Sequence, residues 1–132
     1  ILLNKEIDGF VVNRLQGALL EEAFRLVGSG IVSAADLDKA IADGLGLRWS
    51  FMGPMKTIHL NAPGGVADYV ERYGSMYRGF DLHADSDNTW DRVTRQSLRA
   101  ELEAVIPIHE IPAAQAERDK KLMALIKHKQ KS

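Results

Sequence analysis

Two places in the sequence hold polar side chains that could support chemistry. Asn13 lies in residues 10–27, where apolar residues recur at helical spacing, and on a helical wheel it falls within the apolar arc between Leu20 and Phe24. Burying an amide without partners costs about 1–3 kcal/mol, so Asn13 needs a hydrogen-bonding role. A helix cap or internal polar link and a ligand-binding role both remain open. Gln16 shares the arc and raises the same question.

The second place is the dipeptide Arg48-Trp49, which follows a glycine-rich stretch at residues 44–46 that we expect to be a loop. A guanidinium in a loop can form a two-pronged pair with a carboxylate or phosphate. Spacing alone favours the alternative, a surface arginine stacked on its neighbouring indole. The glycines do not form a dinucleotide-binding fingerprint, because a third glycine is missing and no strand precedes them.

The remaining reactive residue types form no recognisable site. With no cysteine, the sequence excludes disulfides and thiolate catalysis. The four histidines lie in separate segments without metal-ligand spacing, so we expect no metal site: they are His59, His83, His109 and His128. No serine has a nearby base that would suggest a nucleophilic triad.

The elements that must position these residues are predicted to be helices. Apolar periodicity, capping residues and glycine or proline breaks predict about five or six of them with short connections, which indicates a compact all-α bundle. They cover about residues 10–27, 34–43, 55–60, 66–80, 88–105 and 112 onward. Residues 1–7 are interpreted as an orphan strand that lacks a sheet to pair with.

The composition of the chain limits the classes of binding partner that we expect for it. The 132 residues fit one domain, and 17 basic against 18 acidic residues leave a net charge of −1, so no overall field attracts nucleic acid or an anionic membrane. No apolar run approaches the roughly 20 residues that cross a bilayer. We therefore expect no nucleic acid or membrane partner and a cytoplasmic location, which the absence of cysteine also fits.

A series of short motifs runs in order through residues 5–74. They are DGFVVNRL at 8–15, Glu22-Ala23, Leu26-Val27, GIVS at 30–33, DLD at 36–38, Gly44-Leu45-Gly46 and Gly53-Pro54. The series resembles the C-terminal domain of the NAD-dependent 3-hydroxyacyl-CoA dehydrogenase family. Acyl-CoA members usually run from the glycines into Pro-Met-Gly-Pro, whereas this chain has RWSF inserted at residues 48–51. This departure favours a gulonate-like small anionic 3-hydroxy acid over a 3-hydroxyacyl-CoA.

The resemblance implies the domain organisation. Residues 9–132 would form a helical bundle similar to the C-terminal domain of 6-phosphogluconate dehydrogenase, which closes the substrate cleft and makes a homodimer. Residues 1–8 would be the remnant of the last strand of an N-terminal Rossmann domain. That domain would bind NAD and carry a catalytic histidine with its glutamate partner. This chain alone is therefore expected to bind no cofactor and to have no dehydrogenase activity.

The resemblance also implies roles for particular residues. Asn13 would be the catalytic, substrate-facing asparagine, and Arg48 with Trp49 would bind the small-molecule substrate, with Arg48 facing its carboxylate. In the complete enzyme the histidine would take the proton of a 3-hydroxyl while hydride passes from C3 to NAD. Candidate dimer contacts, which the pattern equally allows as internal core, are Tyr69, Tyr73, Met76, Tyr77 and Trp90. The alternative function is an autonomous helical interaction module without catalysis.

Overall fold

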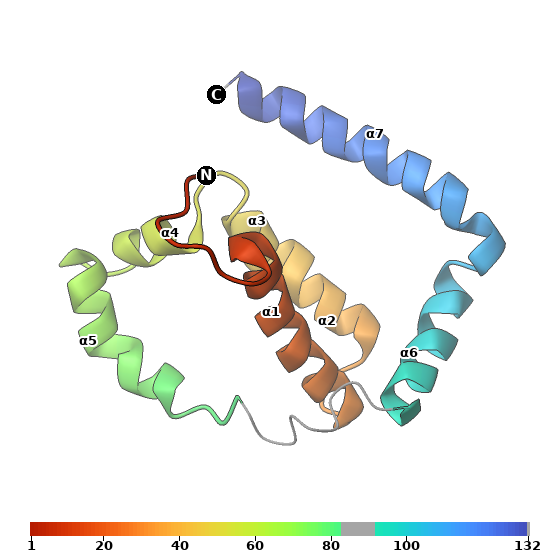
Figure 1. Ribbon diagram of the computed structural model, residues 1–132, viewed down its shortest axis with the longest axis horizontal. Coiled ribbons are helices and arrows are strands. Elements are labelled where there is room, and N and C mark those ends of the chain that lie inside the picture. The colour runs from red at the N-terminus through yellow and green to blue at the C-terminus, as the bar shows by residue number, and fades with distance from the viewer. Residues whose placement is uncertain (83–91, 132) are drawn as a thin grey trace.

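The regular elements among the described residues are helices, which confirms the predicted all-α class (Figure 1). The computed structural model describes residues 1–82 and 92–131. Within these ranges the α-helices are α1 (Phe10–Gly28), α2 (Ala34–Ala40), α3 (Gly46–Arg48), α4 (Pro54–Leu60), α5 (Gly65–Arg78), α6 (Arg92–Val105) and α7 (Ile111–Gln130). A π-helical turn, η1 (Ile41–Leu45), joins α2 to α3, and a 3-10 turn, η3 (Ile108–Glu110), precedes α7. The expected start of α6 at residues 86–91 lies outside the described residues.

Helix α1 ends, and helix α2 begins, at residues that the sequence singles out, whereas the predicted end of the second helix at about residue 43 is wrong because the helical path continues to Arg48. At the end of α1, Gly30 has a left-handed φ of 72°, and the Ile31 amide donates to the Leu26 carbonyl at 3.0 Å. This geometry closes a helix with glycine just beyond its end. The hydroxyl of Ser33 then caps α2 by accepting from the Asp36 amide at 3.1 Å.

Two local predictions are wrong. Residues 1–7, expected to be a strand, form bends and irregular chain. A strand needs a neighbour to satisfy its backbone, and the described residues contain no other strand. Residues 44–48, which belong to the expected loop at residues 44–49, continue the helical path from α2 through η1 into α3. Gly46 permits this tight path, because a Cβ there would lie 2.9 Å from the Ile41 carbonyl oxygen.

Helices α1, α2 and α6 pack together around small residues. Ala23 on α1, Ala34 on α2 and Thr94 on α6 are buried. Gly28 presents no side chain to α6, which allows Thr94 to approach the end of α1. Glu101 reaches from α6 to the start of α2, where its carboxylate accepts from the Ala35 amide at 3.0 Å. A charged acceptor at a helix N-terminus stabilises that end of the helix.

Helices α4 and α5 form a second packed unit. The His59 ring accepts a hydrogen bond at Nδ1 from the Val66 amide at 2.9 Å, which ties the end of α4 to the start of α5. Gly65 lies against this ring with a φ of 79°, and a Cβ there would come within 2.6 Å of His59. The close turn therefore requires glycine at this position.

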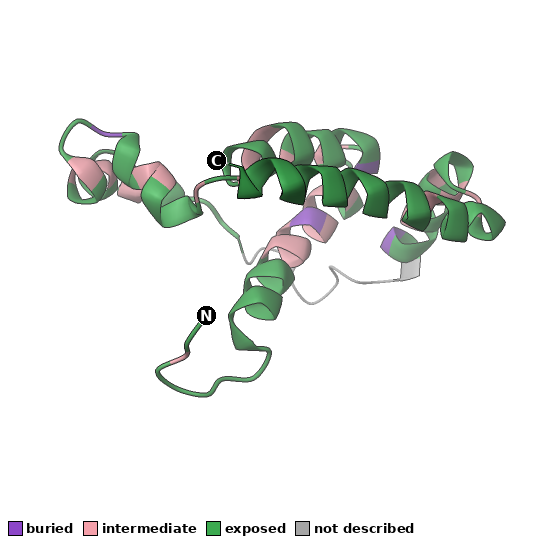
Figure 2. Cartoon of the chain, turned by 90° about the horizontal axis from the view of Figure 1, so that it is seen from above, coloured by how far each residue is buried: buried purple, intermediate pink, exposed green. Residues whose placement is uncertain are grey.

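Much of the apolar surface of the chain is exposed. Its accessible surface is 10897 Å², whereas a folded monomer of this mass is expected to expose about 6,900 Å². Helices α5 and α7 extend to either side of α1 and α2 (Figure 1), and exposed residues cover most of each helix (Figure 2). Among the described residues, the buried ones are three alanines and one threonine: Ala23, Ala34, Ala62 and Thr94. This surface is suited to further protein contacts.

The described residues contain no helix that is both long and apolar enough to span a membrane.

Candidate functional site

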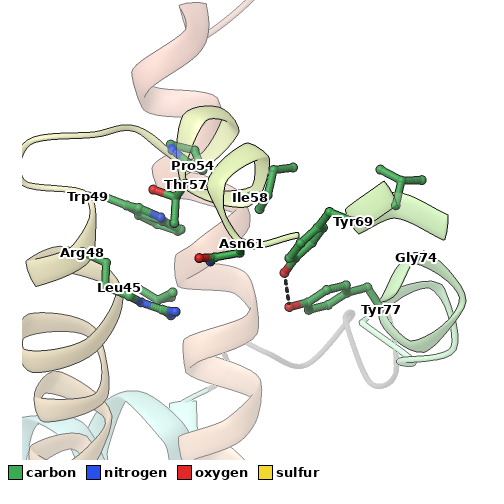
Figure 3. A pocket seen from close by; sticks show the side chains of 11 residues that line it. Leu45, Arg48, Trp49, Pro54, Thr57, Ile58, Asn61, Tyr69, Gly74 and Tyr77 are labelled. Atoms are coloured by element: carbon green, nitrogen blue, oxygen red, sulfur yellow. Dashed lines mark hydrogen bonds between the residues drawn. The ribbon is translucent and has the colours of Figure 1, made fainter. Parts of the chain in front are cut away.

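A pocket of about 480 Å³ lies between the end of α3, helix α4 and helix α5 (Figure 3). Most of its wall is apolar, and the polar side chains that face it come from each of the three sides. The lining residues are Leu45, Arg48, Trp49, Pro54, Thr57, Ile58, Asn61, Tyr69, Val70, Gly74 and Tyr77. The structure thus places Arg48 and Trp49, the two predicted substrate-binding residues, in one concave site.

Backbone hydrogen bonds hold Arg48 and Trp49 at the mouth of this pocket. Arg48 is the last residue of α3, and the Trp49 amide donates to the Leu45 carbonyl at 2.9 Å. The Ser50 hydroxyl donates to the Gly46 carbonyl at 2.8 Å, which fastens the chain after the helix. Arg48 and Trp49 therefore lie at the hydrogen-bonded end of a helix and not in the loop that we expected.

The guanidinium of Arg48 has no carboxylate partner within ion-pair distance in the described parts of the chain. Nor does a cation–π contact join it to Trp49 within those parts, so the stacking part of the alternative is not formed there, while Arg48 is exposed as a surface arginine would be. A cation at the edge of a mostly apolar pocket attracts an anion more strongly than one in bulk water. The arrangement is suited to binding a carboxylate or phosphate.

Two tyrosines on α5 form the facing wall. Their hydroxyl oxygens, on Tyr69 and Tyr77, lie 2.9 Å apart in a hydrogen bond (Figure 3). This bond and partial burial raise the pKa of Tyr69 above its ordinary value, while the positive charge of Arg48 acts in the opposite direction. The hydrogen bond to Tyr77 outweighs the opposing charge of Arg48, so the Tyr69 hydroxyl keeps its proton more strongly than an ordinary tyrosine.

Asn13 is placed elsewhere. It lies in the first turns of α1, its side chain is exposed, and it is not among the residues that line the pocket. Within the described ranges it makes no side-chain hydrogen bond, and Gly9, without a side chain, occupies the cap position of α1. Neither the cap nor the internal polar link is therefore formed, and the amide is available to a ligand or another domain.

Sequence reasoning missed the tyrosine wall as part of a site. Tyr69 and Tyr77 were expected at a dimer surface or in the core, and Thr57 and Asn61 were assigned no role in a site. The available signal was the spacing of Tyr69, Tyr73 and Tyr77, which places all three on one side of a helix. That spacing cannot show which other element the helix faces.

The described residues offer no site for a metal and do not fit a dinucleotide. They contain no group of three or more potential metal ligands. His59 is engaged with the backbone of α5, and the ring of His128 packs edge-on against Phe51, with centroids 6.1 Å apart. Gly44 and Gly46 lie inside helical turns rather than in a loop after a strand, so they cannot cradle a pyrophosphate in the usual way.

The described residues thus form a helical domain with a pocket of about 480 Å³, which Arg48 and Trp49 help to line. Residues 9–100 match the family described as 3-hydroxyacyl-CoA dehydrogenase, C-terminal domain. The chain belongs to this family, which confirms the predicted resemblance.

Three relatives illustrate the range of similar proteins. The lambda-crystallin homolog of Homo sapiens is 38% identical over 129 residues, which are 96% of this chain and 40% of that protein. The homolog of Rattus norvegicus is 61% identical over 69 residues, covering 52% of this chain and 21% of the protein. An L-carnitine dehydrogenase of Streptomyces coelicolor is 37% identical over 103 residues, which are 77% of this chain and 30% of that protein.

These relatives are longer proteins, and the chain spans at most 40% of the length of the three. The motifs at residues 13–16, 46–49, 52–54 and 59–61 look most like those of L-gulonate 3-dehydrogenase, which is also known as lambda-crystallin. The lambda-crystallin relatives confirm that likeness.

Proposed function

We propose that this chain is the substrate-cleft and dimerisation domain of an NAD-dependent dehydrogenase that oxidises a 3-hydroxy acid to the 3-keto product. A gulonate-like small acid is favoured over a 3-hydroxyacyl-CoA. The observation that carries the proposal is the guanidinium of Arg48, which faces a mostly apolar pocket without a carboxylate partner in the described residues. Membership of a dehydrogenase family supports the reaction class.

Arg48 and Trp49 would bind the substrate. The planar guanidinium can form two parallel hydrogen bonds with a carboxylate, which fixes the orientation of the acid as well as its affinity. The indole of Trp49 adds apolar surface beside the charge, which keeps water from the carbon chain. A small acid held at one end by its carboxylate presents the hydroxyl on its third carbon at a defined place.

Asn13 would position the reacting group. The first half of α1 exposes large apolar side chains, with Phe10 61%, Val12 67% and Leu15 64% exposed, and Asn13 lies among them. Such a surface supports the docking of an N-terminal Rossmann domain, to which residues 1–8 would belong. The amide would then lie between the two domains and orient the substrate by hydrogen bonding.

NAD and the proton acceptor would belong to that N-terminal domain, because the described residues of this chain do not fit a dinucleotide. The chain alone is therefore expected to be inactive as a dehydrogenase. The exposed apolar side chains of α5 and α7 support a homodimer through the helical domain. A cytoplasmic location is proposed on the absence of cysteine.

The test uses a chimera in which this chain replaces the corresponding 129-residue region of the human lambda-crystallin homolog. Production of NADH from L-gulonate is measured for the chimera and for this chain alone. The chimera is expected to be active and the chain inactive. Steady NADH production by the chain alone, or none by a folded chimera, would overturn the proposal.

Substitutions in the chimera separate the two roles. Asn13→Ala is expected to lower kcat by about 10- to 100-fold, while Arg14→Ala, on α1 but outside the apolar arc and also exposed, serves as its control. Arg48→Leu is expected to raise KM by about 10- to 100-fold, since a charge-assisted pair is lost. Arg78→Leu, at the exposed end of α5 and outside the pocket, is the matched control. Unchanged kinetics would remove the corresponding residue from the site.

The alternative is an autonomous interaction module without catalysis. The extensive exposed apolar surface favours it as a second candidate. A chimera that folds and dimerises but produces no NADH with any 3-hydroxy acid would support this alternative.

A further inference from the structure

The tyrosine wall of the pocket has its own chemistry. Tyr69 and Tyr77 lie 8 residues apart, so two turns of α5 bring their rings to the same side, and the hydroxyls meet at 2.9 Å. The rings are nearly parallel, with an interplanar angle of 20° and centroids 6.4 Å apart. Both hydroxyls are therefore held at one fixed place on the wall.

A bonded pair of hydroxyls retains hydrogen-bonding capacity. One hydroxyl donates to the other, so the pair keeps one unused hydrogen and several oxygen lone pairs. Asn61, at the end of α4, adds an amide with donors and an acceptor, and Figure 3 shows it between Arg48 and the tyrosine hydroxyls. The pocket thus presents a cation at one side and neutral donors and acceptors at the other.

We propose that the Tyr69–Tyr77 hydroxyl pair is a specificity determinant that recognises hydroxyl groups along the carbon chain of a carboxylate bound by Arg48. The inference rests on the proposed role of Arg48. A hydroxylated acid can form hydrogen bonds with the tyrosine pair, because an alcohol is both donor and acceptor. An aliphatic acid of the same length offers the pair no hydrogen bond, so the pocket discriminates against it.

The experiment is an NMR titration of the full chain that follows the assigned indole N–H signal of Trp49. Gluconate is compared with hexanoate, an unhydroxylated acid of the same chain length. The wild-type chain is expected to bind gluconate more tightly. Tyr77→Phe and Tyr69→Phe should each weaken gluconate binding by about two- to tenfold and leave hexanoate binding unchanged, since each removes a hydroxyl and keeps the ring.

Tyr73→Phe is the matched control. Tyr73 lies on the same helix with its ring centroid 4.8 Å from that of Tyr69, yet it does not line the pocket. Removing the Tyr73 hydroxyl should leave the affinities for gluconate and for hexanoate unchanged. Equal losses in the Tyr73 and Tyr77 variants would indicate a general effect on α5 and refute hydroxyl recognition.

Arg48→Leu separates this inference from the proposed function. Arg48→Leu should weaken the binding of both acids by about 10- to 100-fold, as it should raise KM. If Arg48→Leu weakens both acids while Tyr77→Phe and Tyr69→Phe weaken neither, hydroxyl recognition is wrong and the carboxylate role stands. If Arg48→Leu changes neither affinity, the carboxylate site is wrong and the inference falls with it. Absence of any gluconate-dependent shift at Trp49 in the wild-type chain also overturns the inference.

Discussion

Replacing Gly28 with alanine should loosen the contact between α1 and α6. A Cβ at Gly28 would lie 2.7 Å from the Thr94 hydroxyl oxygen and 3.4 Å from its methyl carbon. Thr94 is only 6% exposed, so its side chain has little room to move aside. Overpacking of a filled contact costs about 1–3 kcal/mol, and we expect that loss in the free energy of unfolding.

Gly17→Ala on the same helix is the matched control. No atom lies within 4 Å of a Cβ built at Gly17, so the substitution adds only helix propensity. It should stabilise the chain by about 0.5–1 kcal/mol. The two variants should therefore differ by about 1.5–4 kcal/mol in urea unfolding, where 1 kcal/mol corresponds to about 3–5 °C in Tm.

A second substitution tests whether crowding against Thr94 causes the loss of stability. Thr94→Ala in the Gly28→Ala background removes the crowded atoms and should recover part of the lost stability, giving a favourable coupling energy in a double-mutant cycle. If Gly28→Ala is as stable as Gly17→Ala, then α6 does not pack against the end of α1 as described, and the reasoning is refuted.

Three further predictions concern other contacts. Glu101→Ala should lower the free energy of unfolding in urea by about 1–2 kcal/mol, because the start of α2 loses the carboxylate acceptor that α6 provides. Glu103→Ala, which breaks only an exposed ion pair on α6, should cost under about 0.5 kcal/mol. Equal effects of the two substitutions would contradict the capping of α2 by Glu101. The hydrogen bond from Arg72, then that from the Gly64 amide, lowers the pKa of Asp68 below 3.8. The stabilisation that ionised Asp68 provides is therefore present above that pH and declines as the pH falls through the lowered pKa. The wild-type chain should therefore be more stable to unfolding than Asp68→Asn, by a difference that shrinks progressively below pH 3.8. A stability difference that does not change with pH would contradict this role of Asp68. Sedimentation velocity should show a homodimer at micromolar concentrations, and a monomer there would count against the proposed dimer.

The sequence alone determined most helix positions and several of their ends. Periodicity over residues 10–27 predicted α1, the hydroxyl of Ser33 predicted the start of α2, and Pro54 predicted the first turn of α4. These features depend on hydrogen bonds and side chains within a few residues of one another, so a local pattern contains the necessary information. The helical path through Gly46 escaped prediction, because glycine indicates a loop as readily as a tight turn.

Only the tertiary structure decided which residues share a site. Arg48 and Tyr77 face one pocket because α4 folds back onto α5, and Glu101 caps α2 from a helix that is distant in sequence. The helical wheel of α1 placed Asn13 on an apolar arc. Other helices cover that arc only in the second half of α1, and the first half, which holds Asn13, is exposed. Periodicity shows which residues share a face of a helix. What the face meets depends on contacts between distant segments and other chains, which no local pattern encodes.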